Sequence, residues 1–141
     1  PWQVHNYRNR ISGPLLDRFD LQIEVPRLSY TELADAREIE ASAVVRERVM
    51  RNRQKQWQRF GCSRTNAEMT SRETKEICVL DSSGEALLKK VFEQNFYSAR
   101  AYDRILRVAR TIADMGDSEQ IKVEHLAESL QYRALDRELI L

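Results

Sequence analysis

The segment from Ser98 to Gly116 constrains the fold most, because it carries the signals of a single amphipathic helix. Serine is a favoured N-cap residue, and glycine commonly ends a helix. Between them lies an apolar face at helical spacing, formed by Tyr102, Ile105, Ala109 and Ile112. The whole chain has four glycines and three prolines, too few for a turn-rich β fold. We therefore predict a mainly α protein.

A second face of the same segment consists of Arg100, Arg104 and Arg107, at helical spacing. Arg100 would lie in the first turn, where the helix dipole favours acidic residues. This electrostatic cost suggests an anionic partner. The alternative is a set of surface ion pairs with Asp103 or Glu93.

A long helix is predicted after Ser29, because Ser29-Tyr30-Thr31-Glu32 has the form of a capping box. The helix should reach about Gln58, and Gly61 should end it. At ~1.5 Å per residue it would be about 40 Å long, so it either extends beyond a compact bundle or breaks near Ala43. Its expected apolar face is Leu33, Ala36, Ile39, Ala43, Met50 and Trp57.

Shorter helices are predicted in three further segments. Thr70 and Ser82 each precede a glutamate by three residues, so they should cap helices that end near Ile77 and Gln94. The last helix should lie within residues 121–133. The buried positions are expected to be Leu87, Leu88, Val91 and Phe92 in the second of these helices, and Val123, Leu126, Ala127 and Leu130 in the third, with His125 structural.

The N-terminal part has a strand-like run. Leu21, Ile23 and Val25 alternate with polar residues at the two-residue period of a strand, and Pro26 ends the run because proline has no N–H for pairing. We predict a strand here, without a neighbouring strand in the rest of the chain.

A charged cluster precedes that run, with Arg18 between Asp17 and Asp20. In one interpretation the two aspartates pair with Arg18 and fix a turn. In the other, Arg18 is held so that it can reach a phosphate, which suits the planar guanidinium group.

The stretch from Arg46 to Arg64 is strongly basic, with seven basic residues and one acidic residue. Interleaved glutamines and Trp57 make it similar to a nucleic-acid-binding surface. The alternative is a solvated helix face. The candidate nucleic-acid contacts are Arg46, Arg51, Arg53, Lys55 and Arg59.

Composition sets broader limits. A chain of 141 residues that is 42% hydrophobic and 32% charged is long enough for one soluble domain with a core. We expect no signal peptide, and because no apolar run approaches the ~20 residues that span a bilayer, we expect no membrane contact. Cys62 and Cys78 form no CxxC motif, which predicts no metal site and reduced thiols in a cytoplasmic protein. Because residue 1 is proline, we expect an excerpt of a longer protein.

Several blocks resemble one family. Residues 13–21 resemble the segment before the last core strand of AAA+ ATPases of the magnesium-chelatase type, particularly the ComM/YifB-like proteins. Residues 98–100 and 104–114 are similar to the C-terminal signature of that family. Val49, Arg53, Gln56 and Arg59 match a ComM-like pattern, although Asn52 replaces the usual alanine.

The resemblance implies roles that spacing alone does not give. Arg18 would be the arginine finger that acts in trans on ATP bound by a neighbouring subunit. Arg100 would be the sensor-2 arginine at the γ-phosphate, acting in cis or in trans. Residues 1–28 would be the tail of the ATPase core, not necessarily ordered here, and residues 29–141 the helical lid.

The implied parent protein is an ATPase that uses ATP and Mg²⁺ in a homo-oligomeric ring, a hexamer in ComM-like proteins, to remodel or translocate DNA. The alternatives are the motor of a magnesium chelatase, or a stand-alone helical module that binds nucleic acid. The chain itself has no Gly-x-x-x-x-Gly-Lys-Ser/Thr loop and no acidic Mg²⁺ motif after an apolar run. We therefore expect it to depend on the missing AAA+ core and to be inactive alone.

Overall fold

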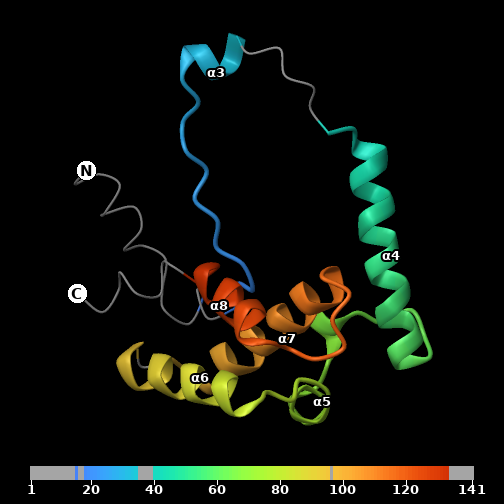
Figure 1. Ribbon diagram of the computed structural model, residues 1–141, viewed down its shortest axis with the longest axis vertical. Coiled ribbons are helices and arrows are strands. Elements are labelled where there is room, and N and C mark those ends of the chain that lie inside the picture. Colours follow the sequence, from blue (N-terminus) through green and yellow to red (C-terminus); the bar gives the residue numbers. More distant parts are fainter. Residues whose placement is uncertain (1–14, 16–17, 35–39, 96, 134–141) are drawn as a thin grey trace.

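The structure is mainly α-helical in the part of the chain that the computed structural model describes, residues 15, 18–34, 40–95 and 97–133. Five helices, α4 to α8, follow the short helix α3, and the predicted fold class is confirmed (Figure 1). Their bounds are α3 Tyr30–Ala34, α4 Ser42–Phe60, α5 Ser71–Ile77, α6 Ser82–Asn95, α7 Ala99–Met115 and α8 Val123–Gln131, with a 3₁₀ turn, η1, at Asn66–Glu68.

Helix α7 is the centre of the bundle, because it contacts α4, α5, α8 and η1. Its predicted apolar face supplies Ile105 and Ala109 to the core, both almost fully buried. Helix α8 adds Leu126 and Leu130, as predicted. The other buried core residues are Met69, Cys78, Leu88, Leu106, Ala113 and Ile121, and Leu80 forms a parallel bridge with Ile121.

Local signals set most helix ends. The Ser98 hydroxyl accepts the Ala101 N–H at 3.2 Å, and Gly116 is the C-cap of α7. Thr70 and Glu73 form the predicted capping box of α5. Helix α6 differs by one residue: it begins at Ser82, and Asp81 Oδ1 accepts the Gly84 N–H at 2.7 Å, so Asp81 is the cap.

The predicted long helix is interrupted. Glu40 and Ala41 are not helical, α4 begins at Ser42, and Gly61 ends it with a left-handed φ of 67°. The alternative of a break near Ala43 is therefore confirmed, while Ala36 and Ile39 lie outside the described residues.

The inward face of α4 is polar, contrary to prediction. Its buried residues are Asn52 and Gln56, whereas Ala43 is exposed and Met50 and Trp57 are half-buried. The reason is its neighbour: Gln56 Oε1 accepts the backbone N–H of Asn66 in η1 at 2.9 Å.

The predicted strand is not formed in the described residues. Leu21, Ile23 and Val25 are 50%, 68% and 84% exposed, and the polar Gln22 is buried instead. No partner strand is described beside them, so alternation has no packed face to satisfy. The Gln22 N–H donates to the Tyr132 carbonyl at the end of α8 (2.7 Å).

Candidate functional site

Arg18 lies in a turn whose backbone N–H donates to the Leu15 carbonyl at 3.0 Å. Its side chain is exposed and has no hydrogen bond or ion pair in the described part of the chain. Asp17 lies outside the described residues. Asp20 does not fix the turn by pairing with Arg18, because its carboxylate pairs with Arg104 of α7, 84 residues further along the chain. Asp20 therefore attaches the turn to α7, while the Arg18 guanidinium has no partner among the described residues.

Arg100 lies in the first turn of α7 and is also exposed. Within the described residues its side chain has no hydrogen bond or ion pair. The two acids proposed as local partners are engaged elsewhere: Asp103 accepts from the Ser71 hydroxyl (2.5 Å), and Glu93 faces Lys89 (4.0 Å). An unpaired cation therefore sits at a helix start, where the dipole disfavours it.

The other two arginines of this helix face have structural partners. Arg104 binds Asp20, and Arg107 donates to the Thr74 hydroxyl (3.3 Å) and the Ala67 carbonyl (3.2 Å). Because Arg100 is one helical turn before Arg104, and Arg18 is two residues from Asp20, the ion pair brings Arg18 and Arg100 to the same end of the bundle. The sequence could not show this contact, which joins distant segments.

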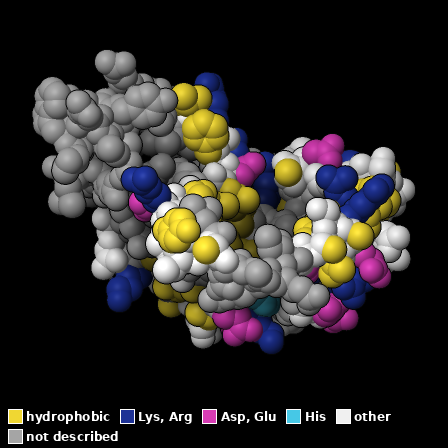
Figure 2. Space-filling model, turned by 90° about the horizontal axis from the view of Figure 1, so that it is seen from above, with side chains coloured by type: hydrophobic (Ala, Val, Ile, Leu, Met, Phe, Trp, Pro, Cys, Tyr) yellow, Lys and Arg dark blue, Asp and Glu magenta, His cyan; other side chains and the backbone are white. Residues whose placement is uncertain are grey.

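The basic stretch divides into two parts. Arg46, Arg51 and Arg53 are exposed on α4, beside the exposed Val45 and Val49. The N-terminal half of α4 extends away from the bundle (Figure 1), and Figure 2 shows basic, acidic and hydrophobic side chains mixed on the side of the molecule where α4 lies. Arg46 and Arg53 are seven residues apart and share one side of α4, whereas Arg51 lies on another side, where its charge acts on Asp117. The three exposed arginines together are called the α4 basic surface below.

Lys55 and Arg59, the other two predicted nucleic-acid contacts, have partners within the protein. Lys55 Nζ donates to the Asp114 carbonyl (2.5 Å) and to Asp117 Oδ1 (2.6 Å). Arg59 makes two hydrogen bonds to the Asp114 carboxylate and one to Asn66 Oδ1 (2.8 Å). Both side chains join α4 to the end of α7.

Asp114 is the centre of a buried polar network that periodicity did not reveal. Its side chain is 2% exposed, and it accepts from Arg59, from Asn66 Nδ2 (2.8 Å) and from Arg110 Nε (3.2 Å). Arg110 is itself buried and donates to the carbonyls of Ser118 and Glu119 (2.5 and 2.7 Å). Hydrophobic periodicity gave no signal for this network, because the buried Gln56 lies on a different side of α4 from the predicted apolar residues Met50 and Trp57.

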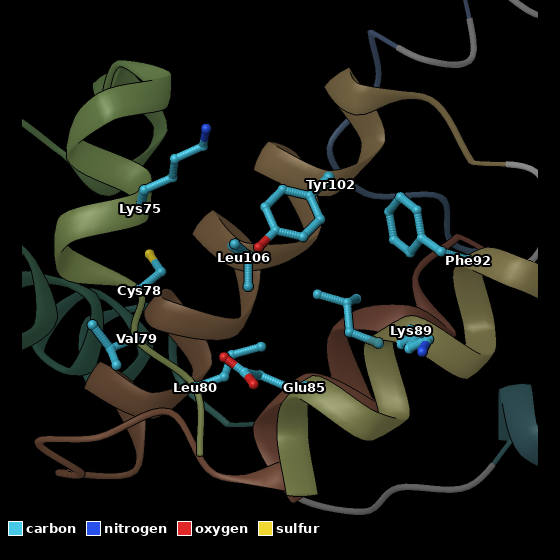
Figure 3. Close-up of a pocket in the computed structure, with 10 residues that line it drawn as sticks. Lys75, Cys78, Val79, Leu80, Glu85, Lys89, Phe92, Tyr102 and Leu106 are labelled. Carbon is cyan, nitrogen blue, oxygen red and sulfur yellow. The ribbon is translucent and has the colours of Figure 1, made fainter. Parts of the chain in front are cut away.

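An apolar groove of about 510 Å³ lies between α5, α6 and α7 (Figure 3). Cys78, Leu88 and Leu106 line it, and Lys75 and Lys89 lie at its edge. Burial raises the pKa of the Cys78 thiol to about 11. Glu85 also lines the groove, and in the described residues its carboxylate forms no ion pair with Lys75 or Lys89. The described residues include no cluster of His, Cys, Asp or Glu able to hold a metal. His125 is structural, because its Nδ1 accepts the Lys122 N–H at 3.1 Å.

The helical bundle and the segment that carries Arg18 define the chain as the C-terminal region of a magnesium chelatase-like protein. The chain belongs to the family described as magnesium chelatase, subunit ChlI C-terminal, whose model matches residues 39–133. The model described as magnesium chelatase, subunit ChlI matches residues 1–33.

Three curated relatives are longer than this chain. The chain is 46% identical over 138 residues to competence protein ComM of Haemophilus influenzae, covering 97% of this chain and 27% of ComM. It is 42% identical over 145 residues to the uncharacterised protein YifB of Escherichia coli (99% and 28%) and 32% identical over 130 residues to an uncharacterised protein of Mycobacterium tuberculosis (90% and 25%). The chain thus spans about a quarter of the length of the curated relatives it matches.

No helix in the described residues is long and apolar enough to cross a membrane.

Proposed function

We propose that this chain is the lid region of an ATP-driven ring protein, and that Arg18 and Arg100 stabilise the γ-phosphate of one bound ATP. The observation that carries the proposal is that these two arginines are exposed, lack partners in the described residues and lie at the same end of the bundle. Family membership supports a nucleotide as the anion.

The chemistry is electrostatic. As the γ-phosphoryl group leaves, negative charge spreads over its oxygens. A positioned guanidinium stabilises this charge, which raises the rate of hydrolysis by ~10³–10⁵-fold in the best-studied cases. Arg18 acts on nucleotide held by a neighbouring subunit. Because the Asp20–Arg104 ion pair keeps Arg100 near Arg18, we propose that both arginines address the same nucleotide, in trans. ATP and Mg²⁺ are held by the core of the protein, because the chain has no phosphate-binding loop.

The test is ATP hydrolysis by the full-length protein in its assembled form. Arg18→Ala and Arg100→Ala should each lower kcat at least a hundredfold without changing oligomeric state or helical content. Arg72→Ala, at an exposed ion pair with Glu76 on α5, is the matched control and should keep the wild-type rate. Full activity of Arg18→Ala in the ring would contradict the proposal.

The work done by hydrolysis is proposed to be movement or remodelling of DNA, as the resemblance to ComM-like proteins implies. The α4 basic surface supports this, since its three arginines are exposed on α4. The alternative activity, metal insertion by a chelatase, rests on the family description alone. No feature of the described part of the bundle matches it. DNA-stimulated hydrolysis would favour the first alternative.

A further inference from the structure

The segment Arg18–Gln22, called the Arg18 segment below, is fastened to the helical bundle at three points. Asp20 pairs with Arg104 of α7, the Phe19 carbonyl accepts from Arg133 Nη1 (3.1 Å), and the Gln22 N–H donates to the Tyr132 carbonyl (2.7 Å). Two of these contacts reach the C-terminal end of α8 and one reaches α7. All three contacts therefore join the N-terminal segment to α7 or to the end of α8.

The contact at Phe19 comes from a deeply buried side chain. Arg133 is 1% exposed, and its guanidinium lies 5.9 Å from the centre of the Tyr97 ring, just before α7 begins. Burial and a charge-assisted hydrogen bond make this the fixed end of the attachment. By contrast, Asp20 is half exposed and the Arg104 side chain is 23% exposed, so this pair can break without opening the core.

Arg104 and Arg100 lie on the same face of one continuous helix, one turn apart. A helix is stiff over that distance, so a displacement of Arg100 moves Arg104 with it. Asp20, two residues from Arg18, follows because its carboxylate is bound to Arg104. The contacts therefore form a mechanical path between Arg100 and Arg18 within a single subunit.

We propose that Arg104 and Asp20 are a positioning pair that couples Arg100 to Arg18, so that the lid helix sets where the Arg18 guanidinium points. This inference rests on the proposed function, because it assumes that Arg18 and Arg100 contact nucleotide. Neither Arg104 nor Asp20 touches the phosphate. Their effect is to place Arg18, and a misplacement of about 1 Å in a catalytic group costs on the order of a hundredfold in rate.

The experiment measures kcat and KM for ATP in the full-length, assembled protein. Arg104→Gln and Asp20→Asn should each lower kcat about tenfold to a hundredfold with little change in KM. The swap that combines Asp20→Arg with Arg104→Asp should recover part of the activity. Arg72→Gln, which removes an exposed ion pair on α5, is the control and should have no effect.

A double-mutant cycle separates positioning from simple loss of structure. If Arg104 acts through Arg18, then Arg104→Gln should cause no further decrease in an Arg18→Ala background, because the group that it positions is gone. Additive decreases would overturn the coupling. Amide hydrogen exchange in residues 18–22 should also become faster in Arg104→Gln, while exchange in α7 and α8 stays unchanged; unchanged exchange in residues 18–22 would overturn the attachment.

The two proposals fail in different ways. If Arg18→Ala keeps the wild-type rate, the proposed function is wrong. If Arg18→Ala is inactive but Arg104→Gln and Asp20→Asn keep the wild-type kcat, the proposed function stands and the positioning role is wrong.

Discussion

The Asp114 carboxylate accepts two hydrogen bonds from the guanidinium of Arg59, which joins the end of α7 to the end of α4. Part of the basic stretch from Arg46 to Arg64 is therefore structural, because one of its cations neutralises a buried acid. Three of the other six cations also pair with acids, since Arg48, Lys55 and Arg64 bind Glu40, Asp117 and Glu73. The last three, Arg46, Arg51 and Arg53, form the α4 basic surface. A single helix thus carries both structural cations and exposed ones.

Loss of the Asp114 charge should destabilise the domain strongly. Asp114→Asn leaves Arg110, whose side chain is 3% exposed, without a counter-charge, and breaking a buried pair in this way costs about 3–5 kcal/mol. The free energy of unfolding, measured by denaturant titration, should fall by that amount. Asp117→Asn is the matched control, since Asp117 is 85% exposed and asparagine tolerates its positive φ, and it should change stability little. Equal decreases in the two variants would contradict a buried role for Asp114.

The capping box of α5 should make stability depend on acid pH. Hydrogen bonds from Arg64 and from the Thr70 backbone and hydroxyl lower the pKa of Glu73 from 4.5 to about 2. Since the folded-state pKa is lowered, Glu73 stabilises the fold fully above pH 4.5, and this contribution disappears as the pH falls from about 4.5 through about 2. The difference in melting temperature between wild type and Glu73→Gln should therefore shrink over that window. A difference that stays constant from about pH 6 to about pH 2 would contradict the assignment.

The two cysteines should differ in reactivity. Cys62 is exposed, whereas Cys78 is buried and its pKa is raised to about 11 by burial, so its thiol stays protonated near neutral pH. At about pH 8, a thiol-specific reagent should modify one cysteine in the folded chain and two after denaturation. Cys62→Ser should abolish the reaction of the folded chain, and rapid modification of that variant would show that the core opens.

The α4 basic surface should bind DNA in a salt-dependent manner. Reversing its charge with Arg46→Glu, Arg51→Glu and Arg53→Glu should weaken binding and reduce the salt slope by ~0.7–0.9 for each phosphate that is no longer neutralised. The matched control combines Arg72→Glu, Lys75→Glu and Lys89→Glu, which changes the net charge equally at exposed positions on α5 and α6. Fluorescence anisotropy at several salt concentrations measures both quantities. Equal weakening in the two triple variants would indicate a general effect of charge.

Helix ends were predictable where the signal was local. Ser98, Thr70, Gly61 and Gly116 act through hydrogen bonds or dihedral angles within a few residues of themselves. The error at Ser82 arose from competition between neighbours, because Asp81 offers an equally good cap one residue earlier.

Faces were predictable only where burial is apolar. Periodicity placed Ile105, Ala109, Leu126 and Leu130 in the core, as the structure confirms. It failed on α4, where Gln56 Oε1 accepts the Asn66 N–H and Asn52 Nδ2 donates to the Arg48 carbonyl of the same helix. Arg59 joins this side of α4 to the Asp114 network. A pattern that scores hydrophobicity cannot identify a polar interface.

By itself, the sequence determined the helical class, most helix ends and part of the apolar core, because local propensity and periodicity encode these features. Arg18 and Arg100 became candidate site residues through the resemblance to a known family. Only the tertiary structure decided which arginines are engaged within the described residues and which are not. Asp20 pairs with Arg104, 84 residues away, and Arg59 pairs with Asp114, 55 residues away. Ion pairs at such separations depend on how the helices pack, and no local pattern along the chain records that packing.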